Sequence, residues 1–304
     1  MRNKLLYLFV LAITASFSQI KTEEILLKND GIELPGTLTY SNKKSPLVIW
    51  VHGSGNVDRN GNQGGIIKAN YIQQIREKLN RNNIAFYSFD KRTANPKNTN
   101  LLKGVVFDDF VKDVKIAINH FKNEKRFSKI ILIGHSQGSL TAMLAAKNID
   151  KYISLAGLSE SFDKTMIWQI SKQNKALGKI AEAHFKELFE NKTIAKVNPY
   201  LVSIFKEANY PFLINWAKYN PTQEIQNLRI PSLIINGTKD IQVRVSDAKS
   251  LHRAHTTSEL FIIENMNHVL KHIEVDSDNM KSYYSADFPI SSELIPILVN
   301  FIKK

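Results

Sequence analysis

Cysteine is absent from the 304 residues of this chain. No disulfide framework can form, and thiol catalysis, a cysteine-ligated metal and a lipid-attachment cysteine are all excluded. The fold must therefore be held by its hydrophobic core, for which 43% hydrophobic and 23% charged residues are ordinary values. Length and composition together predict a globular protein that is large enough for one α/β domain and an insertion, with two unrelated domains as the alternative.

Clustered positive charge is also missing. The chain has 41 Lys and Arg against 28 Asp and Glu, a net charge of +13, but its basic residues are scattered along the sequence. A nucleic-acid surface needs Arg and Lys grouped with aromatic side chains, so we expect no nucleic-acid partner. The sequence gives no indication of an oligomeric state.

No apolar run reaches the roughly 20 residues that are needed to span a bilayer. The best candidate is at the N-terminus, where Arg2 and Lys4 precede the apolar stretch 5–13 and small residues follow up to Ser18. A basic start, a short apolar segment and a small-residue cleavage site are typical of a signal peptide. We therefore predict that residues 1–18 are removed, that the mature protein is not stably inserted in a membrane, and that it is periplasmic or extracellular.

Short apolar runs alternate with amphipathic stretches along the rest of the chain. This pattern predicts an α/β fold, with a mostly parallel eight-stranded sheet flanked by helices. The first two strands, 23–27 and 34–40, are expected to form an antiparallel hairpin. Further strands are expected at 47–51, 85–89, 130–133, 152–155, 233–235 and 260–263, and helices at 67–80, 107–121, 139–147, 243–254 and 292–302.

One stretch, residues 159–227, contains no strand-like run, and its apolar residues recur at helical spacing. We predict a helical cap insertion over the carboxyl edge of the sheet, which divides the α/β core into residues 19–158 and 228–304. Four aromatic residues of the cap are predicted to line a substrate pocket, with a place in the helical core as the alternative: Phe205, Tyr210, Phe212 and Trp216.

The segment Gly134-His135-Ser136-Gln137-Gly138 lies between an apolar strand and a predicted helix. In a G-x-S-x-G sequence at such a turn, the glycines make the sharp bend sterically possible and the serine hydroxyl projects from the edge of the sheet. A serine in that position can attack an acyl carbon. We therefore predict that Ser136 is a nucleophile; an ordinary pair of helix-entry glycines is the alternative.

A serine hydroxyl needs a histidine to accept its proton and a carboxylate to fix the tautomer of that histidine. In this architecture the chain order is serine, acid, histidine. Asp240 and His268 each follow a predicted strand directly, so both are expected at the carboxyl edge. Asp247, inside a predicted helix, and His272 are the nearest rivals, and a helix cap is the alternative role of Asp240.

Attack on the acyl carbon creates an oxyanion, which two backbone N–H groups must stabilise. One belongs to the residue after the nucleophile, Gln137, and the other to the loop after the third strand. That loop reads His52-Gly53-Ser54-Gly55. We predict the N–H of Ser54 as the second donor, with a plain glycine turn as the alternative, and we expect His52 to tie its loop by hydrogen bonds.

These motifs resemble, in this order, those of the α/β-hydrolases, and the resemblance covers nearly all of the chain after residue 18. Residues 52–61 (HGSGNVDRNG) and 89–93 (FDKRT) are similar to the HGSG-x-x-DR-x-G and (Y/F)DKR patterns of a group of bacterial carboxylesterases. The resemblance implies hydrolysis of short-chain acyl esters. Asn220 departs from the Asp that this group usually has before a proline. Four charged residues of the two motifs are expected to pair as a scaffold: Asp58, Arg59, Asp90 and Arg92.

Together the residues indicate an exported serine hydrolase that cleaves carboxylic esters, with short acyl chains, through an acyl-enzyme on Ser136. A thioesterase, a peptidase or amidase, and an acyltransferase would use the same triad and remain alternatives. A catalytically inactive fold that binds a small ligand is the alternative from another class. The expected partner is a small acyl ester, and no metal or organic cofactor is expected.

Overall fold

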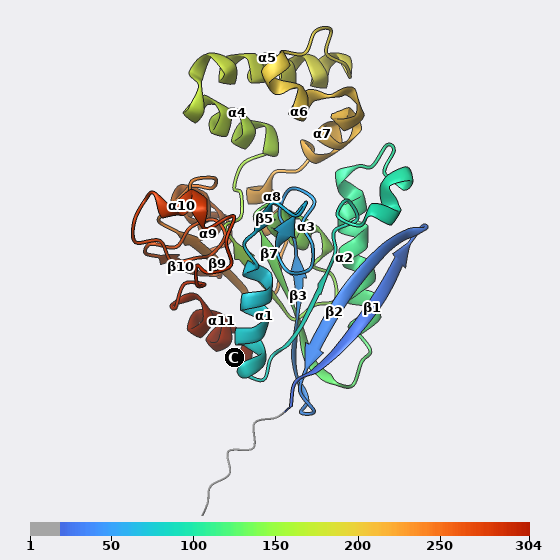
Figure 1. The fold of residues 1–304 in the computed structure, drawn as a ribbon, viewed down its shortest axis with the longest axis vertical. Helices are drawn as coiled ribbons and strands as arrows, with labels where there is room; N and C mark the ends of the chain where they lie inside the picture. Colours follow the sequence, from blue (N-terminus) through green and yellow to red (C-terminus); the bar gives the residue numbers. More distant parts are fainter. Residues whose placement is uncertain (1–18) are drawn as a thin grey trace, which may run out of the picture.

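An eight-stranded, mostly parallel sheet forms the centre of the computed structural model, which describes residues 19–304 (Figure 1). The strand order is β1-β2-β6-β3-β7-β8-β9-β10, and only β1 and β2 run antiparallel to their neighbours. The strands are β1 (Lys21–Asn29), β2 (Ile32–Tyr40), β3 (Ser45–Val51), β6 (Ala85–Phe89), β7 (Phe127–His135), β8 (Lys151–Leu155), β9 (Ser232–Gly237) and β10 (Glu259–Ile263). The predicted fold class is thereby confirmed. The predicted signal peptide, residues 1–18, lies outside the described residues.

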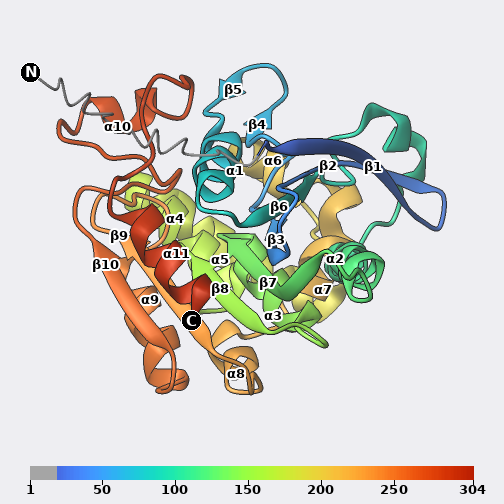
Figure 2. The same ribbon diagram turned by 90° about the horizontal axis from the view of Figure 1, so that it is seen from below.

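Helices cover both faces of the sheet (Figure 2). One face carries α1 (Tyr71–Arg81) and α11 (Leu294–Lys303), and the other carries α2 (Phe107–Phe121), α3 (Gln137–Ala145) and α9 (Val245–Ala254). No helix among residues 19–304 is long and apolar enough to cross a membrane.

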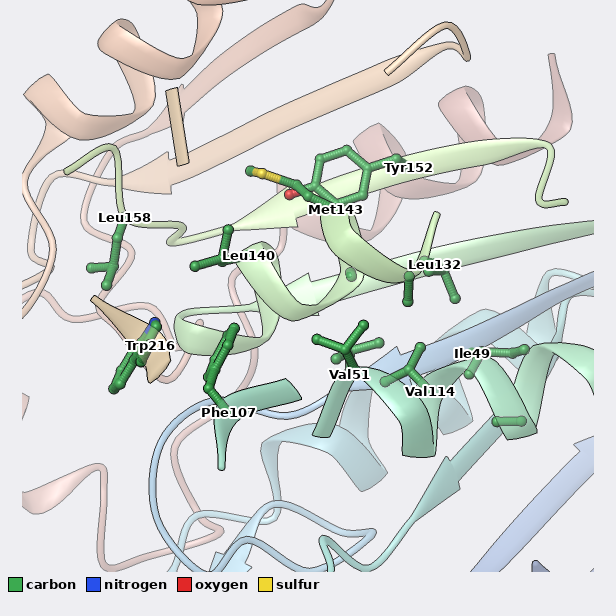
Figure 3. Close-up of a cluster of buried hydrophobic side chains, with 14 of the residues drawn as sticks. Ile49, Val51, Phe107, Val114, Leu132, Leu140, Met143, Tyr152, Leu158 and Trp216 are labelled. Atoms are coloured by element: carbon green, nitrogen blue, oxygen red, sulfur yellow. The ribbon is translucent and has the colours of Figure 1, made fainter. Parts of the chain in front are cut away.

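The central strands are buried on both faces, which explains why their sequences are apolar without alternation. On β3, Ile49 and Val51 join one apolar cluster and Trp50 joins the other. Figure 3 shows Ile49 and Val51 packed with Leu132 of β7 and Val114 of α2. Two apolar layers therefore enclose the central strands, one on each face of the sheet.

The first two strands form the expected hairpin. Their turn, Asp30-Gly31, has φ values of 49° and 86°, which is the geometry that two-residue hairpin loops require. Each strand is longer than the sequence indicated, because the pairing continues from Lys21 opposite Tyr40 to Asn29 opposite Ile32.

The helix predicted at 67–80 begins later than expected. Ile67–Lys68 forms β5, which pairs with β4 (Asn62–Gln63), and α1 starts at Tyr71. Asn70, with φ 48°, is held in the left-handed region by two hydrogen bonds with the side chain of Asn62, at 2.6 and 3.1 Å. This contact between two asparagines delays the helix, and no periodicity of apolar residues could indicate it.

Residues between β8 and β9 form helices and no strand. They are α4 (Phe162–Gln173), α5 (Lys175–Asn191), α6 (Val202–Phe205), α7 (Tyr210–Trp216) and α8 (Pro221–Ile225). Helices α4 to α7 lie at the top of Figure 1, on the side of the sheet where the parallel strands end. Helix α8 instead packs against α3 and α9 of the sheet's helical layer.

The hairpin offers a test of the core. Leu34 is fully buried, whereas Leu26 on the neighbouring strand is 49% exposed. We expect Leu34→Ala to lower the free energy of unfolding by about 2–5 kcal/mol, because it removes buried methyl groups and leaves a cavity. Leu26→Ala should change it by less than about 0.5 kcal/mol. Urea unfolding measures both, and equal effects would contradict the described burial.

Candidate active site

The turn from β7 into α3 is sharply bent at Ser136. Its φ of 54° and ψ of −122° lie outside the regions that non-glycine residues ordinarily occupy. Two backbone hydrogen bonds hold it there: Ser136 N–H donates to the Leu155 carbonyl, and Ser139 N–H donates to the Ser136 carbonyl, both at 2.9 Å. The surrounding strand and helix thus stabilise a strained residue at a position where a side chain can project beyond the sheet.

Both glycines of the motif are required by close backbone contacts. A Cβ on Gly134 would lie 2.4 Å from the Gly138 carbonyl oxygen, and one on Gly138 would lie 2.2 Å from the Val51 carbonyl oxygen. No side chain fits at those distances. The start of α3 therefore packs directly against the end of β3, and Gln137 becomes the first residue of α3, two residues earlier than predicted.

Asp240 and His268 meet at the same edge. Asp240 follows β9 and His268 follows β10, and His268 Nδ1 lies 2.8 Å from Asp240 Oδ2. Their side chains are 0% and 6% exposed, so the pair is shielded from water. Because a carboxylate can only accept, Nδ1–H is the donor and Nε2 of a neutral ring is left free to take a proton.

The second oxygen of Asp240 has a structural role. Oδ1 accepts hydrogen bonds from the backbone N–H groups of Gln242 and Val243, at 2.8 and 2.9 Å. These bonds fix the loop and delay the start of α9 to Val245, two residues beyond the predicted start. Asp240 therefore orients His268 with one oxygen and fixes its own loop with the other. It does not cap α9, because the N–H of the N-cap residue, Arg244, donates to Asp247 Oδ2 at 3.1 Å.

The rival residues lie elsewhere. Asp247 Oδ1 accepts a hydrogen bond from the Ser159 hydroxyl at 2.6 Å, and Asp247 Oδ2 pairs with Arg244 Nε at 2.9 Å. His272 is directed toward Glu274, with 3.7 Å between Nε2 and Oε1. Neither rival borders the cavity at Ser136.

His135, inside the elbow, is a residue whose role the sequence did not reveal. Its Nε2–H donates to the His268 carbonyl at 2.8 Å, and the Tyr71 hydroxyl lies 3.4 Å from its Nδ1. Burial lowers the pKa of His135 to about 3, so the ring is neutral and Nε2 keeps its role as donor. The residue before the nucleophile therefore fixes the backbone of the loop that carries His268. Only its place in the motif could have suggested this.

The two predicted oxyanion donors lie beside the nucleophile. A Cβ on Gly53 would be 3.2 Å from the Ser136 Cβ, and the next residue, Ser54, borders the same cavity as Ser136 and His268. Gln137 is the first residue of α3, where a backbone N–H has no partner within the helix and the helix dipole favours negative charge. Both donors can therefore face an oxygen bound at Ser136.

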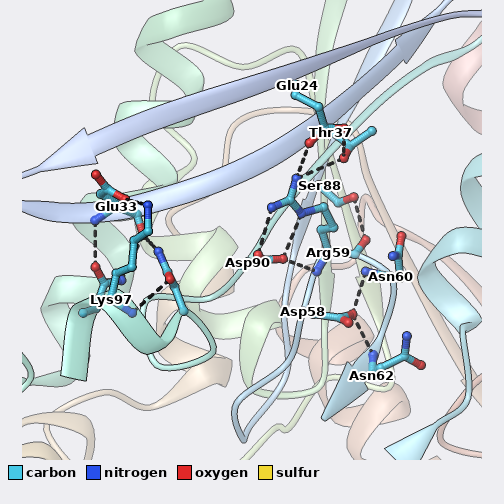
Figure 4. A network of polar contacts seen from close by, with 12 residues as sticks. Glu24, Glu33, Thr37, Asp58, Arg59, Asn60, Asn62, Ser88, Asp90 and Lys97 are labelled. Atoms are coloured by element: carbon cyan, nitrogen blue, oxygen red, sulfur yellow. Dashed lines mark hydrogen bonds and ion pairs between the residues drawn. The ribbon is translucent and has the colours of Figure 1, made fainter. Parts of the chain in front are cut away.

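The charged residues of the two motifs form the expected scaffold in part, since only Arg59 and Asp90 pair with each other. Arg59 binds Asp90 through two parallel hydrogen bonds of 2.9 Å and also contacts Glu24 (Figure 4). Arg92 binds Asp113 of α2 through two bonds of 2.7 Å. Asp58 differs from the expectation, because its Oδ1 accepts from the backbone N–H groups of residues 60 and 62.

His52 confirms its prediction only in part. Its Nε2 has no hydrogen-bond partner among residues 19–304, and its polar contact is with the backbone of Asp58 in the same loop. The ring is buried and packs edge-on against Phe89, with 5.5 Å between centroids. His52 therefore holds its loop by packing as well as by its contact with Asp58.

A cavity of about 350 Å³ opens at Ser136. Its apolar wall includes Leu158, Phe162 and Met166, and its polar groups include Gln169 and Gln242. Helix α4 thus contributes directly to the wall of the site.

Of the four aromatic residues predicted to line this pocket, only Trp216 does so. Trp216 stacks between Phe107 and Phe162 (Figure 3 labels the Phe107–Trp216 pair), with centroid distances of 5.3 and 4.1 Å. The other three pack elsewhere: Phe205 and Tyr210 are buried, with Phe205 against Phe185, and Phe212 is half-buried against Phe107 and Phe110. Helical spacing identifies a buried face, but it does not distinguish a core from a cavity wall.

The site combines a projecting hydroxyl, a histidine base oriented by a carboxylate, and backbone donors, which is the set needed for acyl transfer. No hydrogen bond joins the Ser136 hydroxyl to the His268 ring within residues 19–304, and such bonds commonly shorten only when substrate binds. No group of three His, Cys, Asp or Glu side chains in this part of the chain is arranged to hold a metal ion.

Comparison with known proteins gives a family match and several related folds. A family model described as BD-FAE matches residues 37–255. Esterase EstD of Thermotoga maritima is 25% identical over 248 residues, which cover 78% of this chain. The match spans only 58% of the length of EstD.

Two solved structures share the fold. Est1E of Butyrivibrio proteoclasticus has a TM-score of 0.59 and 17% identity, over 92% of this chain and 99% of Est1E. The Pyrococcus furiosus esterase Pf2001 has a TM-score of 0.58 and 17% identity, over 94% of this chain and 91% of that esterase. At these identities the likeness establishes a common fold.

The buried histidines predict a dependence of stability on pH. Burial lowers the folded-state pKa of His52 from 6.5 to about 3. Between these values the unfolded chain binds one more proton at this site, so stability is fully present above pH 6.5 and falls as the pH decreases. We expect His52→Asn, which cannot titrate, to reduce the slope of unfolding free energy between about pH 6 and 4 by up to about 1.4 kcal/mol per pH unit. Urea unfolding at several pH values measures the slopes, and parallel lines for the two proteins would contradict the assignment.

Proposed function

Because this chain belongs to the BD-FAE family, a family of α/β-hydrolases, we propose that it is a serine hydrolase that cleaves carboxylic esters through an acyl-enzyme on Ser136. The observation that carries the proposal is that Ser136 and His268 border the same cavity. Ser136 has a strained backbone at the turn into α3, and the His268 ring is hydrogen-bonded to Asp240. Each role follows from geometry that this chain's own residues provide.

In the proposed reaction, His268 Nε2 takes the proton of the Ser136 hydroxyl while Oγ attacks the ester carbon. The carbonyl oxygen becomes an oxyanion, which accepts hydrogen bonds from the N–H groups of Ser54 and Gln137. The intermediate collapses as the alkoxide leaves with the proton from His268. Water then gives a proton to His268 as its oxygen attacks the acyl-enzyme. The second intermediate collapses when His268 returns that proton to Ser136 Oγ, which releases the acid and regenerates the free enzyme.

Asp240 contributes at the step that creates charge. When His268 is protonated, its Nδ1–H is already bound to the buried carboxylate, so the imidazolium forms beside a negative charge. The carboxylate also prevents the ring from flipping to the tautomer in which Nε2 carries a proton. Both effects act on the transition state.

An ester substrate is favoured over the alternatives by the relatives. EstD and Pf2001 are both named esterases. A thioester, an amide or an acyl acceptor other than water would need the same triad, and nothing in the site favours one of them. A cavity of about 350 Å³ is at the small end of ligand sites, which supports short acyl chains.

Covalent labelling tests this proposal directly. A fluorophosphonate probe is expected to label the purified protein and not Ser136→Ala, because the probe reacts with an activated serine. His268→Ala and Asp240→Asn are expected to lower turnover of short-chain nitrophenyl esters by about 10⁴-fold or more.

His272→Ala is the matched control and should retain turnover, since its ring lies outside the cavity. Labelling that persists in Ser136→Ala would refute the nucleophile. Full turnover in His268→Ala would remove His268 from the role of base.

We also propose that the chain is exported and cleaved after Ser18, on the basis of its N-terminal pattern. Expression of the full chain in a bacterial host should yield protein outside the cytoplasm that begins at Gln19. N-terminal sequencing checks this, and an uncleaved protein retained in the cytoplasm would contradict it.

A further inference from the structure

The amino group of Lys91 is buried beside the site, directly after β6. Lys91 is 6% exposed, and its Nζ donates hydrogen bonds to the Gly53 carbonyl and to Gln137 Oε1, both at 2.8 Å. Nζ also lies 4.6 Å from the centre of the Phe110 ring. Its two acceptors belong to the two segments that carry the oxyanion donors, so one side chain connects both halves of the oxyanion site.

Burial of this amino group is unfavourable on its own. An apolar side chain of similar length would fill the same space without the loss of hydration. Burial lowers the pKa of Lys91 to about 7, with Asp113 acting in the opposite direction. A neutral amine still has two N–H groups, so both hydrogen bonds can form with the amine charged or neutral.

The bond to Gly53 fixes the direction of the next N–H group. In a trans peptide the carbonyl of one residue and the N–H of the following residue point in opposite directions, and residues 19–304 contain no cis peptide. The Gly53 carbonyl points to Lys91, so the Ser54 N–H points away from Lys91. Ser54 borders the cavity at Ser136 and Lys91 does not, so this orientation is the one required of a donor that faces the site.

The bond to Gln137 acts on the other donor. The Gln137 side chain is buried, and its Oε1 is held by Lys91 at the first turn of α3. The Gln137 carbonyl accepts from the Thr141 hydroxyl at 3.2 Å. The residue that carries the second donor is therefore fixed from both its side chain and its backbone.

The neighbours of Lys91 in the sequence hold it in place. Asp90 binds Arg59 of the loop after β3, and Arg92 binds Asp113 of α2. The backbone N–H of Lys91 itself donates to the Val57 carbonyl at 3.1 Å. Asp-Lys-Arg thus ties the loop after β3, α2 and α3 together, and the lysine lies behind the two segments that carry the oxyanion donors.

We propose that Lys91 is a positioning residue that aligns the Ser54 and Gln137 N–H groups for the oxyanion, an inference that rests on the function proposed above. A donor bound to the Gly53 carbonyl also polarises the Gly53–Ser54 peptide, which makes the Ser54 N–H a stronger donor. The alignment and the polarisation of the donors stabilise the substrate oxygen more strongly as negative charge develops on it. Lys91 therefore acts on the transition state more than on substrate binding.

The test compares Lys91→Met with Lys151→Met. Lys151 is an internal match: it is 6% exposed, donates to the Phe301 carbonyl and lies 5.0 Å from the Phe301 ring, but it is at the start of β8, away from the site. Lys91→Met should lower kcat for a short-chain nitrophenyl ester by about 10- to 100-fold, and KM should change by less than about threefold. This fall in kcat is somewhat smaller than the one caused by losing a whole oxyanion donor. Lys151→Met should leave kcat unchanged.

A transition-state analogue separates positioning from a merely structural role. Inhibition by a trifluoromethyl ketone should weaken in Lys91→Met by the same factor as kcat/KM falls, because the bound analogue carries the oxyanion. Lys91→Gln, which keeps one amide donor, should recover part of kcat, and it provides the comparison if Lys91→Met does not fold.

Several outcomes would overturn the proposal. It fails if a folded Lys91→Met has a kcat within twofold of the wild type, or if both Lys91→Met and Lys151→Met lower stability and kcat alike. Where Lys91→Met does not fold, it fails if Lys91→Gln, which lacks one of the two donors, has a kcat within twofold of the wild type. It also fails if the analogue binds Lys91→Met as tightly as the wild type. In each case Ser136→Ala must still be inactive; activity in Ser136→Ala would instead refute the function on which the inference rests.

Discussion

The contact between the start of α3 and the end of β3 is the constraint on which the rest of the site depends. A Cβ on Gly138 would lie 2.2 Å from the Val51 carbonyl oxygen and 2.5 Å from that of His52, so backbone packs directly on backbone. This approach forces the turn that strains Ser136 and makes Gln137 the first residue of α3. It also brings the loop after β3 beside the nucleophile, where Gly53 has no side chain to obstruct it.

Three buried polar side chains near this contact each fix one segment of the active site. His135 binds the carbonyl of His268, Asp240 binds its ring, and Lys91 binds the loop of Ser54. These bonds are buried, where hydrogen bonds are stronger and unpaired groups are costly. The site is therefore preorganised by the core of the fold, and the groups that act on substrate reorganise little when charge develops.

The sequence predicted the parts of the site that follow from local order. A strand, a G-x-S-x-G turn and a helix are adjacent in the chain, and Asp240 and His268 each follow a strand, so topology alone brings them to one edge. The role of Lys91 could not be predicted, because its acceptors are 38 and 46 residues away in the chain. The prediction that four aromatic residues line the pocket was wrong for three of them, and for a different reason. Phe205 and Trp216 share the same helical periodicity, although Phe205 is buried in the core and Trp216 borders the cavity.

A crystal structure of the protein with a phosphonate covalently bound to Ser136 would show which groups bind the oxyanion, because a phosphonate oxygen occupies its position. We expect one phosphonate oxygen within about 2.7–3.1 Å of both the Ser54 and Gln137 backbone nitrogens, with the Lys91 amine still bound to the Gly53 carbonyl. A phosphonate oxygen bound by other groups, or a Ser54 N–H directed away from it, would refute the roles of Ser54, Gln137 and Lys91.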